Sequence, residues 1–385
     1  MVISIWKDMK FFAVLNLLAL VGYSLAAEGR CPLSPTSASG SATHGGSYCS
    51  GELIFEDNFD WLDEGKWQHE ITLAGGGNWE FQWYVNDRRN SYTENGVLHI
   101  KPTLTSDIYG EDFLYYGNIK LGNECTNADN WGCDRTGSAE DILNPVRSAR
   151  LRTLNSFSFK YGRVEVRAKL PAGDWLWPAI WMLPSQWRYG GWPRSGEIDI
   201  MESRGNRNLV ANGVPIGAEQ IASTMHFGPD STANAWPSAH YERNSAPGRG
   251  FNQDFHRYQL EWTPDHLTFK VDDSELGTVW VGSGFWDRGA FSQNVPWFQN
   301  PWQNGGRDAP FDQEFHILLN LAVGGVNFFP DDAWNPDGKP WSNSAPHGCT
   351  NFWHGHDAWL RTWNYYVPGN TDSHMQIDYV RVWAL

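Results

Sequence analysis

The stretch GEIDIMES at residues 196–203 interleaves three carboxylates with three large apolar side chains. Glu197 and Asp199 are two positions apart, so on a β-strand both side chains point to the same face. Glu202 follows Asp199 by three positions, and regular alternation would send it to the opposite face. One extra residue in a β-bulge around Met201 would bring it back. The pattern therefore predicts a bulged strand that presents three acids together and turns its isoleucines toward a core.

Three acids on one face crowd like charges, which is unfavourable and calls for a reason. The commonest chemical reason is a pair of carboxyl groups that flank a glycosidic bond. The spacing alone is weak, because about 0.6 such triplets are expected in a random chain of this length and composition. By itself it is more typical of a solvated acidic strand. The flanking glycine and the aromatic surroundings favour the catalytic interpretation.

The composition points to a neutral sugar polymer as the ligand. The formal net charge is −15, which disfavours nucleic acid, anionic membranes and sulfated polymers as partners. The chain also contains 23 Trp, 14 Tyr and 20 Phe, many of the Trp beside Gly, Pro or Asn. Indole rings in loops stack well on the apolar C–H faces of sugars. We therefore expect a neutral saccharide to be bound.

The N-terminus has the pattern of a secretory signal peptide. Lys7 and Lys10 precede an apolar run over residues 11–25, which is shorter than the ~20 residues that a membrane span needs. Small residues around Ala26 then offer a cleavage site, so residues 1–27 are predicted to be removed. No second run of this kind follows in the sequence, which predicts a soluble, secreted, extracellular protein.

The five cysteines are disulfide candidates in a secreted chain. Cys125 and Cys133 close a short polar loop and form the first predicted pair. Cys31 with Cys49 is the second, which leaves Cys349 free. Four paired cysteines allow three connectivities, so this pairing is one of several. A structural metal site is not expected, since neither a Cys-x-x-Cys pair nor clustered histidines accompany the cysteines.

The rest of the chain has the pattern of an all-β protein. Residues 28–50 form a short Cys-containing extension, and residues 51–385 are predicted to form one domain. Apolar and polar residues alternate over residues 161–170 and again over residues 375–383, and residues 258–271 have the pattern of a hairpin with Pro-Asp in its turn. Because no repeat is visible, a two-sheet sandwich is a better fit than a propeller.

Aromatic residues surround the acidic strand in the sequence. Residues 177–184 form a predicted strand in which Trp177 and Trp181 share a face, and this face either lines a cleft with the acids or belongs to the core. Trp192 lies in a Gly- and Pro-rich loop that enters the acidic strand, so we place it at the cleft mouth. His226 follows a strand of small residues, and a lone histidine is more often structural than functional.

Several of these motifs together resemble glycoside hydrolase family 16, and within it the laminarinases, which are endo-1,3-β-glucanases. The similarity is carried by residues 177–183 and 191–202, and also by residues 320–325 and 377–383. It extends from about residue 51 to the C-terminus. The alternating strand and the Cys125/Cys133 loop look most like the animal branch, which holds invertebrate laminarinases and β-1,3-glucan recognition proteins.

The resemblance implies a jelly-roll β-sandwich of two antiparallel sheets with an open cleft on its concave face. It implies Glu197 as nucleophile, Glu202 as acid/base and Asp199 as the residue that assists Glu197, with no cofactor required for catalysis. Many members hold a structural calcium ion on the far face, near the positions of Glu56 and Asp378. The resemblance also implies substrate contacts at Trp177, Trp181, Trp192, His226, Asn78 and Glu80.

The expected function is therefore that of a monomeric, secreted, retaining endo-β-1,3-glucanase that cleaves laminarin-type glucans, with transglycosylation as a side reaction. Two alternatives stay open. One is a glucan recognition protein with a vestigial site; many such homologues lack one or both catalytic glutamates, whereas this chain has Glu197, Glu202 and Asp199. The other is an enzyme of the same fold that acts on mixed-linkage glucan or agarose. A merely structural sandwich would leave the acidic strand unexplained.

Overall fold

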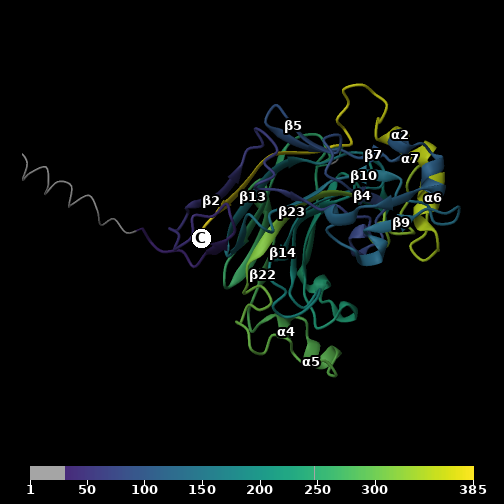
Figure 1. Cartoon of the computed structure of the whole chain (residues 1–385). Coiled ribbons are helices and arrows are strands. Elements are labelled where there is room, and N and C mark those ends of the chain that lie inside the picture. The colour runs from purple at the N-terminus through teal and green to yellow at the C-terminus, as the bar shows by residue number, and fades with distance from the viewer. Residues whose placement is uncertain (1–30, 247) are drawn as a thin grey trace, which may run out of the picture.

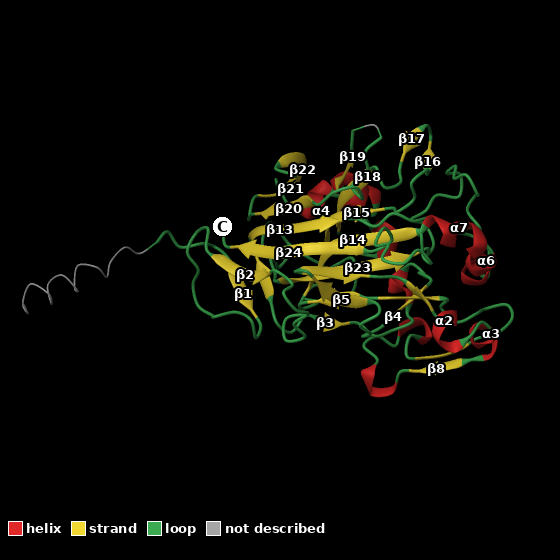
Figure 2. Cartoon of the chain, turned by 90° about the horizontal axis from the view of Figure 1, so that it is seen from above, coloured by secondary structure: helices red, strands yellow, loops and turns green. Residues whose placement is uncertain are grey.

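Two large sheets, mostly antiparallel, form the layers of a jelly-roll sandwich (Figures 1 and 2). The computed structural model describes residues 31–246 and 248–385, and the predicted signal peptide lies outside this range. The sheet that carries the acidic strand has nine strands. Its main path is β1 (Ser37–Ser39), β12 (Ser158–Lys160), β23 (Phe315–Val323), β14 (Leu176–Pro184), β15 (Glu197–Ser203), β18 (Gln220–His226) and β19 (His240–Asn244). Off this path, β11 (Arg150–Arg152) pairs with β23, and β3 (Gln68–His69) pairs with β11.

The second sheet has eight strands and backs the first. In order these are β22 (Ser274–Trp280), β21 (His266–Val271), β20 (His256–Trp262), β13 (Gly162–Lys169), β24 (Met375–Trp383), β6 (Val97–Ile100) and β5 (Ser91–Glu94), with β2 (Leu53–Asp57) beside β24. Three small sheets are formed by β4 (Gln82–Tyr84), β10 (Val146–Ser148) and β7 (Thr103–Leu104), by β16 (Val210–Ala211) and β17 (Val214–Pro215), and by β8 (Asn118–Lys120) and β9 (Asp134–Thr136).

Helices are short and lie in the connections. The α-helices are α2 (Ser106–Tyr109), α3 (Asp112–Tyr116), α4 (Phe285–Arg288), α5 (Phe291–Asn294), α6 (Gly348–His354) and α7 (His356–Thr362). The 3₁₀ turns are η1 (Gly75–Gly77), η2 (Gly122–Glu124), η3 (Asp129–Trp131), η4 (Ser231–Ala233) and η5 (Trp236–Ala239). Within the described ranges no helix has the length and apolarity to cross a bilayer.

The predicted strand patterns are confirmed. β13 alternates buried and more exposed residues along its length, as the charged/apolar alternation over residues 161–170 requires. β20 and β21 pair antiparallel across the Pro-Asp turn, and β24 covers residues 375–383 as predicted. The class is therefore all-β, with the jelly-roll architecture that was expected.

Aromatic side chains fill the space between the two sheets. The ring of Phe159 on β12 lies 5.6 Å from that of Trp262 on β20, and Trp262 lies 5.5 Å edge-on from Phe315 on β23. Edge-to-face pairs at this distance add to the free energy gained by burying the rings. All three residues are fully or almost fully buried. One face of the nine-stranded sheet is thus committed to the core, which leaves its other face for a site.

Both predicted disulfides are present. Cys31 is bonded to Cys49 and Cys125 to Cys133, each pair with Cα atoms 5.5 Å apart, and Cys349 is a free thiol. The first bond closes the N-terminal extension, whose strand β1 pairs with β12 at the sheet edge. The boundaries proposed for the signal peptide, extension and catalytic domain stay predictions.

Candidate active site

The acidic strand β15 is bulged, as the spacing of its carboxylates required. In its pairing with β14, Glu202 lies opposite Ala179 and Asp199 lies opposite Trp181. Between these two pairs, Ile200 and Met201 on β15 face Ile180 alone on β14, and the register shift leaves Ile200 as the extra residue. The bulge predicted around Met201 is confirmed, one position earlier than proposed.

The bulge puts the three acids on the same face of the sheet. On β18 they pair in turn with His226, Thr224 and Ala222, which are two positions apart and so share a face. The side chains that alternate with them are buried on the opposite face: Ile198 and Met201 are both fully inaccessible. The isoleucines are buried as expected, but Met201, not Ile200, takes the regular core position after the bulge.

The surroundings of Glu197 and Asp199 disfavour two negative charges side by side. Burial raises the pKa of Glu197 well above its ordinary value, and the charge of Asp199 raises it further. Burial and then the charge of Glu202 likewise raise the pKa of Asp199. This mutual influence places all three carboxyl groups within electrostatic reach of one another. A buried carboxyl pair of this kind titrates as a unit and shares a proton.

The contacts of each carboxyl group indicate where the shared proton resides. Glu197 Oε2 accepts a hydrogen bond from Trp192 Nε1 at 2.8 Å, and its side chain is 17% exposed. The side chain of Asp199 is 4% exposed, and its Oδ2 lies 3.2 Å from His226 Nε2. That contact is misaligned, so no donor among the described residues is directed at Asp199 Oδ2. We therefore expect Glu197 to hold the negative charge and Asp199 the proton.

Glu202 is oriented by an indole on the neighbouring strand. Trp177 Nε1 donates a hydrogen bond to Glu202 Oε1 at 2.9 Å. The ring of Trp177 stacks on that of Phe328 at 3.8 Å with the planes nearly parallel, and the guanidinium of Arg204 lies 4.3 Å from the Phe328 ring. The register thus places Trp177 and Trp181 on the same face of the sheet as the acids, so this face lines the cleft and not the core between the sheets.

Trp181 lies on the same face of β14 as Trp177, and a side chain of the neighbouring strand β23 holds it in place. Its Nε1 donates to Asn320 Oδ1 at 2.6 Å, and the Arg150 guanidinium lies 5.1 Å from its ring. Asn320 Nδ2 in turn donates to the Tyr84 hydroxyl at 3.2 Å. Asn320 belongs to β23, in which every residue is buried, so the side chain that holds Trp181 is itself packed in place.

His226 ends β18 beside the acids and is not a remote structural histidine. The amide of Asn234 contacts its Nδ1 at 2.8 Å, which leaves Nε2 to face Asp199. Its ring lies 5.6 Å from that of Trp192 and 6.4 Å from that of Trp236. Trp236, 40% exposed, is a cleft residue that sequence reasoning missed, since only its loop position and the following proline marked it.

Asn78 and Glu80, the two predicted substrate contacts near η1, differ in their burial. Asn78 is half-buried at the surface, and its carbonyl accepts a hydrogen bond from Val326 N at 2.7 Å. Glu80 is only 5% exposed and its carboxylate accepts a hydrogen bond from Gln82 Nε2 at 2.7 Å, with Arg150 Nη2 at 3.6 Å. Glu80 therefore supports the segment from below, and direct contact of either residue with substrate stays a prediction.

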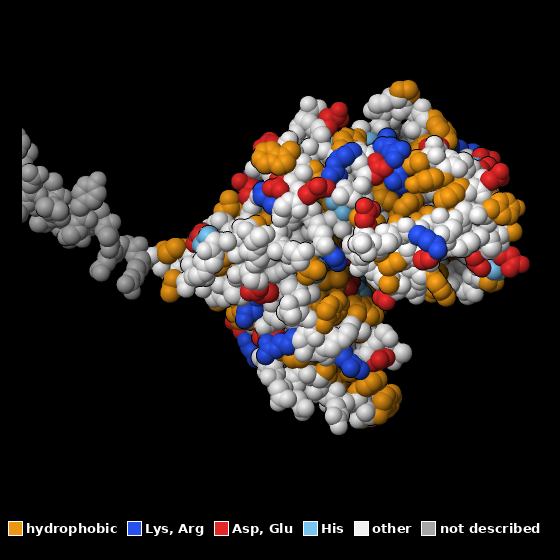
Figure 3. Space-filling view, in the orientation of Figure 1, with side chains coloured by type: hydrophobic (Ala, Val, Ile, Leu, Met, Phe, Trp, Pro, Cys, Tyr) orange, Lys and Arg blue, Asp and Glu red, His pale blue; other side chains and the backbone are white. Residues whose placement is uncertain are grey.

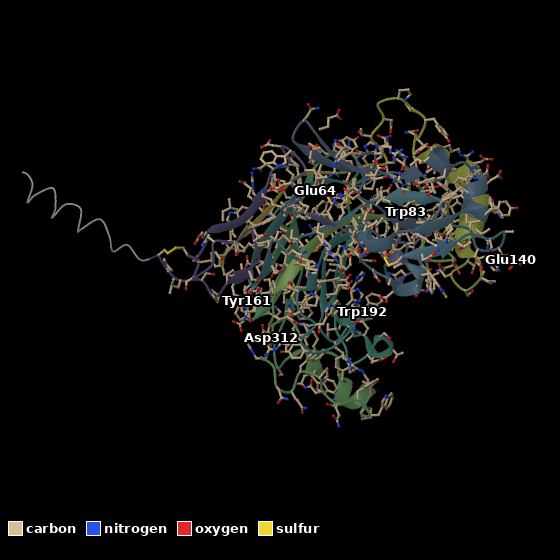
Figure 4. The ribbon with its side chains drawn as sticks, in the orientation of Figure 1. Glu64, Trp83, Glu140, Tyr161, Trp192 and Asp312 are labelled. Atoms are coloured by element: carbon tan, nitrogen blue, oxygen red, sulfur yellow. A yellow bond between two sulfur atoms is a disulfide. The ribbon has the colours of Figure 1, made fainter. Side chains whose placement is uncertain are left out.

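These groups follow a line across the strands. Trp236 borders β18, the acids lie on β15, Trp177 and Trp181 lie on β14, and the segment after Asn78 hydrogen-bonds the end of β23 through its backbone. Figure 3 shows the surface hollowed between the part that bears α4 and α5 and the larger part of the molecule, and Trp192, labelled in Figure 4, lies at this hollow. The site is an open, aromatic-lined cleft.

The two carboxylates named for the expected calcium ion, those of Glu56 and Asp378, both contact arginine side chains. Glu56 Oε1 accepts from Arg381 Nε at 2.8 Å, and Asp378 Oδ2 accepts from Arg167 Nη1 at 2.5 Å. Each carboxylate is thus paired with an arginine, and a calcium ion at this place stays a prediction. In the described ranges, His, Asp and Glu atoms with metal-ligand spacing occur together at the acidic strand and His226.

The raised pKa of Asp199 predicts a pH-dependent cost in stability. The folded protein keeps this proton to higher pH than the unfolded chain does, so raising the pH above about 4 favours unfolding. Asp199→Asn should therefore raise the Tm by about 2–4 °C at pH 8 and leave it unchanged at pH 4. Thermal unfolding followed by circular dichroism at both pH values measures this. Asp357→Asn, which alters a fully exposed carboxylate, is the control and should change neither Tm.

Comparison with known proteins finds a family pattern and relatives. The pattern of glycosyl hydrolases family 16 matches residues 123–293. A β-1,3-glucan-binding protein of Penaeus monodon is 50% identical over 341 residues, covering 86% of this chain and 90% of that protein. β-1,3-Glucan-binding protein 1 of Manduca sexta is 35% identical over 346 residues, covering 88% of this chain and 66% of that protein.

Solved structures share the fold. The laminarinase of Rhodothermus marinus is 26% identical in sequence and has a TM-score of 0.53. The match covers 87% of this chain and 97% of the laminarinase. An endo-β-1,3-glucanase of Pyrococcus furiosus is 24% identical in sequence and has a TM-score of 0.53. The match covers 89% of this chain and 96% of the glucanase. With the bulged acidic strand and the relative at 50% identity, these similarities show that the chain belongs to glycosyl hydrolase family 16.

Proposed function

We propose that this protein is a secreted, retaining endo-β-1,3-glucanase that hydrolyses laminarin-type glucans. The observation that carries the proposal is the bulge in β15, which turns Glu197 and Glu202 to one cleft face, each hydrogen-bonded by an indole N–H. Retaining glycosidases need two carboxyl groups on either side of the scissile bond, about 5–5.5 Å apart. The similarity to a laminarinase at 26% identity supports the choice of substrate.

In the first step Glu197 attacks the anomeric carbon while Glu202 gives its proton to the departing oxygen, which yields a glycosyl ester and a shortened glucan. Trp192 holds the attacking carboxylate through its 2.8 Å hydrogen bond, and the proton on Asp199 prevents a second charge from building up beside it. Trp177 holds Glu202 from the other side at 2.9 Å, so neither carboxyl group is free to rotate away.

In the second step Glu202, now ionised, takes a proton from water, whose oxygen attacks the anomeric carbon and releases Glu197. The two inversions leave the configuration unchanged. A sugar hydroxyl in place of water would transfer the glycosyl group to another chain. The cleft is open to solvent at Trp192, which is 42% exposed, so both acceptors have access.

The names of the relatives favour a second candidate function. The similar proteins of Penaeus monodon and Manduca sexta are called β-1,3-glucan-binding proteins. An aromatic cleft serves recognition as well as hydrolysis, so a glucan sensor without turnover is the alternative. Export from the cell is part of both proposals and is supported by the predicted signal peptide and by the two disulfides.

Purified protein should release reducing ends from laminarin, and the first product should be the β-anomer because the mechanism retains configuration. Reducing-sugar assays with oligosaccharide analysis measure the first point, and NMR of the fresh product measures the second. Glucan binding without any new reducing ends would identify the recognition protein instead. An α-anomer as first product would contradict the double displacement, and faster cleavage of mixed-linkage glucan or agarose would change the substrate.

A further inference from the structure

A cavity of about 890 Å³ lies beside the Asn78–Glu80 segment, away from the acids. It is enclosed by η1, by β9 with the disulfide loop that precedes it, and by the residues that lead into α6. β9 and α6 lie toward the right-hand end of the molecule in Figure 1. Its volume falls within the range of about 300–1,000 Å³ typical of small-molecule sites. The proposed mechanism makes no use of it.

Two exposed indoles border this cavity. Trp79 is 51% exposed and Trp131 is 71% exposed, although a tryptophan buries more surface than any other side chain when it packs. Both also have left-handed backbones, with φ of 51° and 59°. This conformation is costly for a bulky residue, and such strain gathers at functional sites. Two strained, solvent-exposed tryptophans at one cavity therefore indicate a ligand that stacks on them.

The loop that carries Trp131 is held in place before any ligand arrives. The Cys125–Cys133 disulfide closes it, and the Thr72 hydroxyl donates to the carbonyl of Asn127 at 2.7 Å. Arg135 Nη2 donates to the carbonyl of Asn130, the residue before Trp131, at 2.6 Å. A pre-organised loop loses little conformational entropy when a ligand binds.

The charged side chains at the cavity are already paired. His347 Nδ1 lies 2.8 Å from Asp141 Oδ1, Asp134 lies 3.5 Å from Lys120, and Arg135 Nη1 donates to an asparagine. The cavity therefore offers polar atoms and indole faces without a cluster of one sign. This lining suits an uncharged, hydroxyl-rich ligand with apolar C–H faces, which is a sugar chain.

A short chain of contacts links the cavity to the cleft. Val326 lines it and donates a backbone hydrogen bond to Asn78, the neighbour of Trp79. Two residues further along the chain from Val326, Phe328 stacks on Trp177, which in turn donates to Glu202. Neither Trp177 nor the three acids line the cavity, so it lies outside the place where the bond is cleaved.

We propose that Trp79 and Trp131 form a remote subsite that binds a neutral β-glucan several units away from the bond that is cleaved. The inference rests on the proposed function for the identity of the polymer. It adds that long glucan chains are held at two places, the acidic cleft and this cavity, while short oligosaccharides occupy the cleft alone. Trp79 and Trp131 then determine the preference for chain length.

The test compares long and short ligands in the Glu197→Gln protein, which is expected to bind without cleaving. Trp131→Gly and Trp79→Gly should each weaken binding of laminarin by about 3- to 10-fold in calorimetric titration, the loss of one aromatic contact. Binding of laminaritriose should change less than about 2-fold. Because glycine relieves the left-handed backbone, the Tm should not fall. Trp131→Phe should keep most of the affinity.

Trp297→Ala is the matched control, since this indole is 73% exposed and does not line the cavity. It should leave both affinities unchanged. Unchanged laminarin binding in both glycine variants would overturn the subsite, and so would an equal loss for laminarin and laminaritriose. Failure of the wild-type protein to hydrolyse laminarin would refute the proposed catalysis only, because the subsite is measured by affinity and not by turnover.

Discussion

Glu197→Gln should lower turnover of laminarin by about three to five orders of magnitude while the affinity for glucan changes little. The amide is a poor nucleophile and cannot form the glycosyl ester. Its shape is that of the glutamate, and its carbonyl oxygen can still accept the Trp192 N–H that Glu197 Oε2 accepts at 2.8 Å. The cleft should therefore stay assembled around an inert group.

Reducing-end release gives the turnover of the Glu197→Gln variant, and calorimetric titration with laminarin gives its affinity. Glu94→Gln, an exposed position on the other sheet, is the control and should behave as wild type. Wild-type hydrolysis by Glu197→Gln would remove this residue from the mechanism. Loss of binding together with turnover would indicate a damaged cleft, which the Tm would reveal.

The second large effect is expected for Glu202→Gln. General acid catalysis contributes about 10²–10⁴-fold, so turnover of laminarin should fall by that factor. An aryl β-glucoside with an activated leaving group needs no protonation, and its first step should proceed at close to the wild-type rate. Azide needs no general base, so it should restore turnover and yield a β-glycosyl azide, which NMR identifies.

The two substitutions give different signatures because the two carboxyl groups do different work. Azide attack on the ester requires that Glu197 has formed it, so azide should not give a β-product with Glu197→Gln. If neither an activated substrate nor azide restores Glu202→Gln, Glu202 is not the acid/base. Trp177 donates to Glu202 at 2.9 Å, and the amide oxygen of glutamine can accept the same hydrogen bond, so folding should be preserved.

An aromatic cleft can serve both glucan binding and glucan cleavage. The relatives of the highest identity given above carry binding names, yet this chain keeps the carboxyl groups, their indole donors and an open approach to them. A vestigial site would have no need to maintain Asp199 buried beside Glu197, since the raised pKa of that pair costs stability at neutral pH. Turnover of laminarin is therefore the first property to measure.

Local patterns in the sequence predicted those features whose cause is local. Alternation over residues 161–170 and 375–383 predicted β13 and β24, because side chains on a strand repeat every two residues. The interval between Asp199 and Glu202 predicted the bulge, because three positions cannot return to the same face without one extra residue. The disulfides followed from sequence proximity.

Features that depend on long-range packing were not visible in the sequence. The stacking of Phe328 on Trp177 joins residues far apart in the chain, and the bond from Trp181 to Asn320 does so as well. The burial of Glu80 near Arg150 likewise joins residues that are distant in the chain. Residues next to these positions in the sequence do not indicate such pairs, because the order of the strands in the sheet determines which distant residues become neighbours.

The sequence by itself determined the strands, the bulge and the set of acids, because these depend on the two-residue period of a strand and on neighbouring residues. Only the tertiary structure decided which face of β14 meets the acids, which indole donates to each glutamate, and that Trp131 and Trp79 line one cavity. Those relations are set by antiparallel register and by a loop closed by a disulfide, which bring together residues that the chain itself keeps apart.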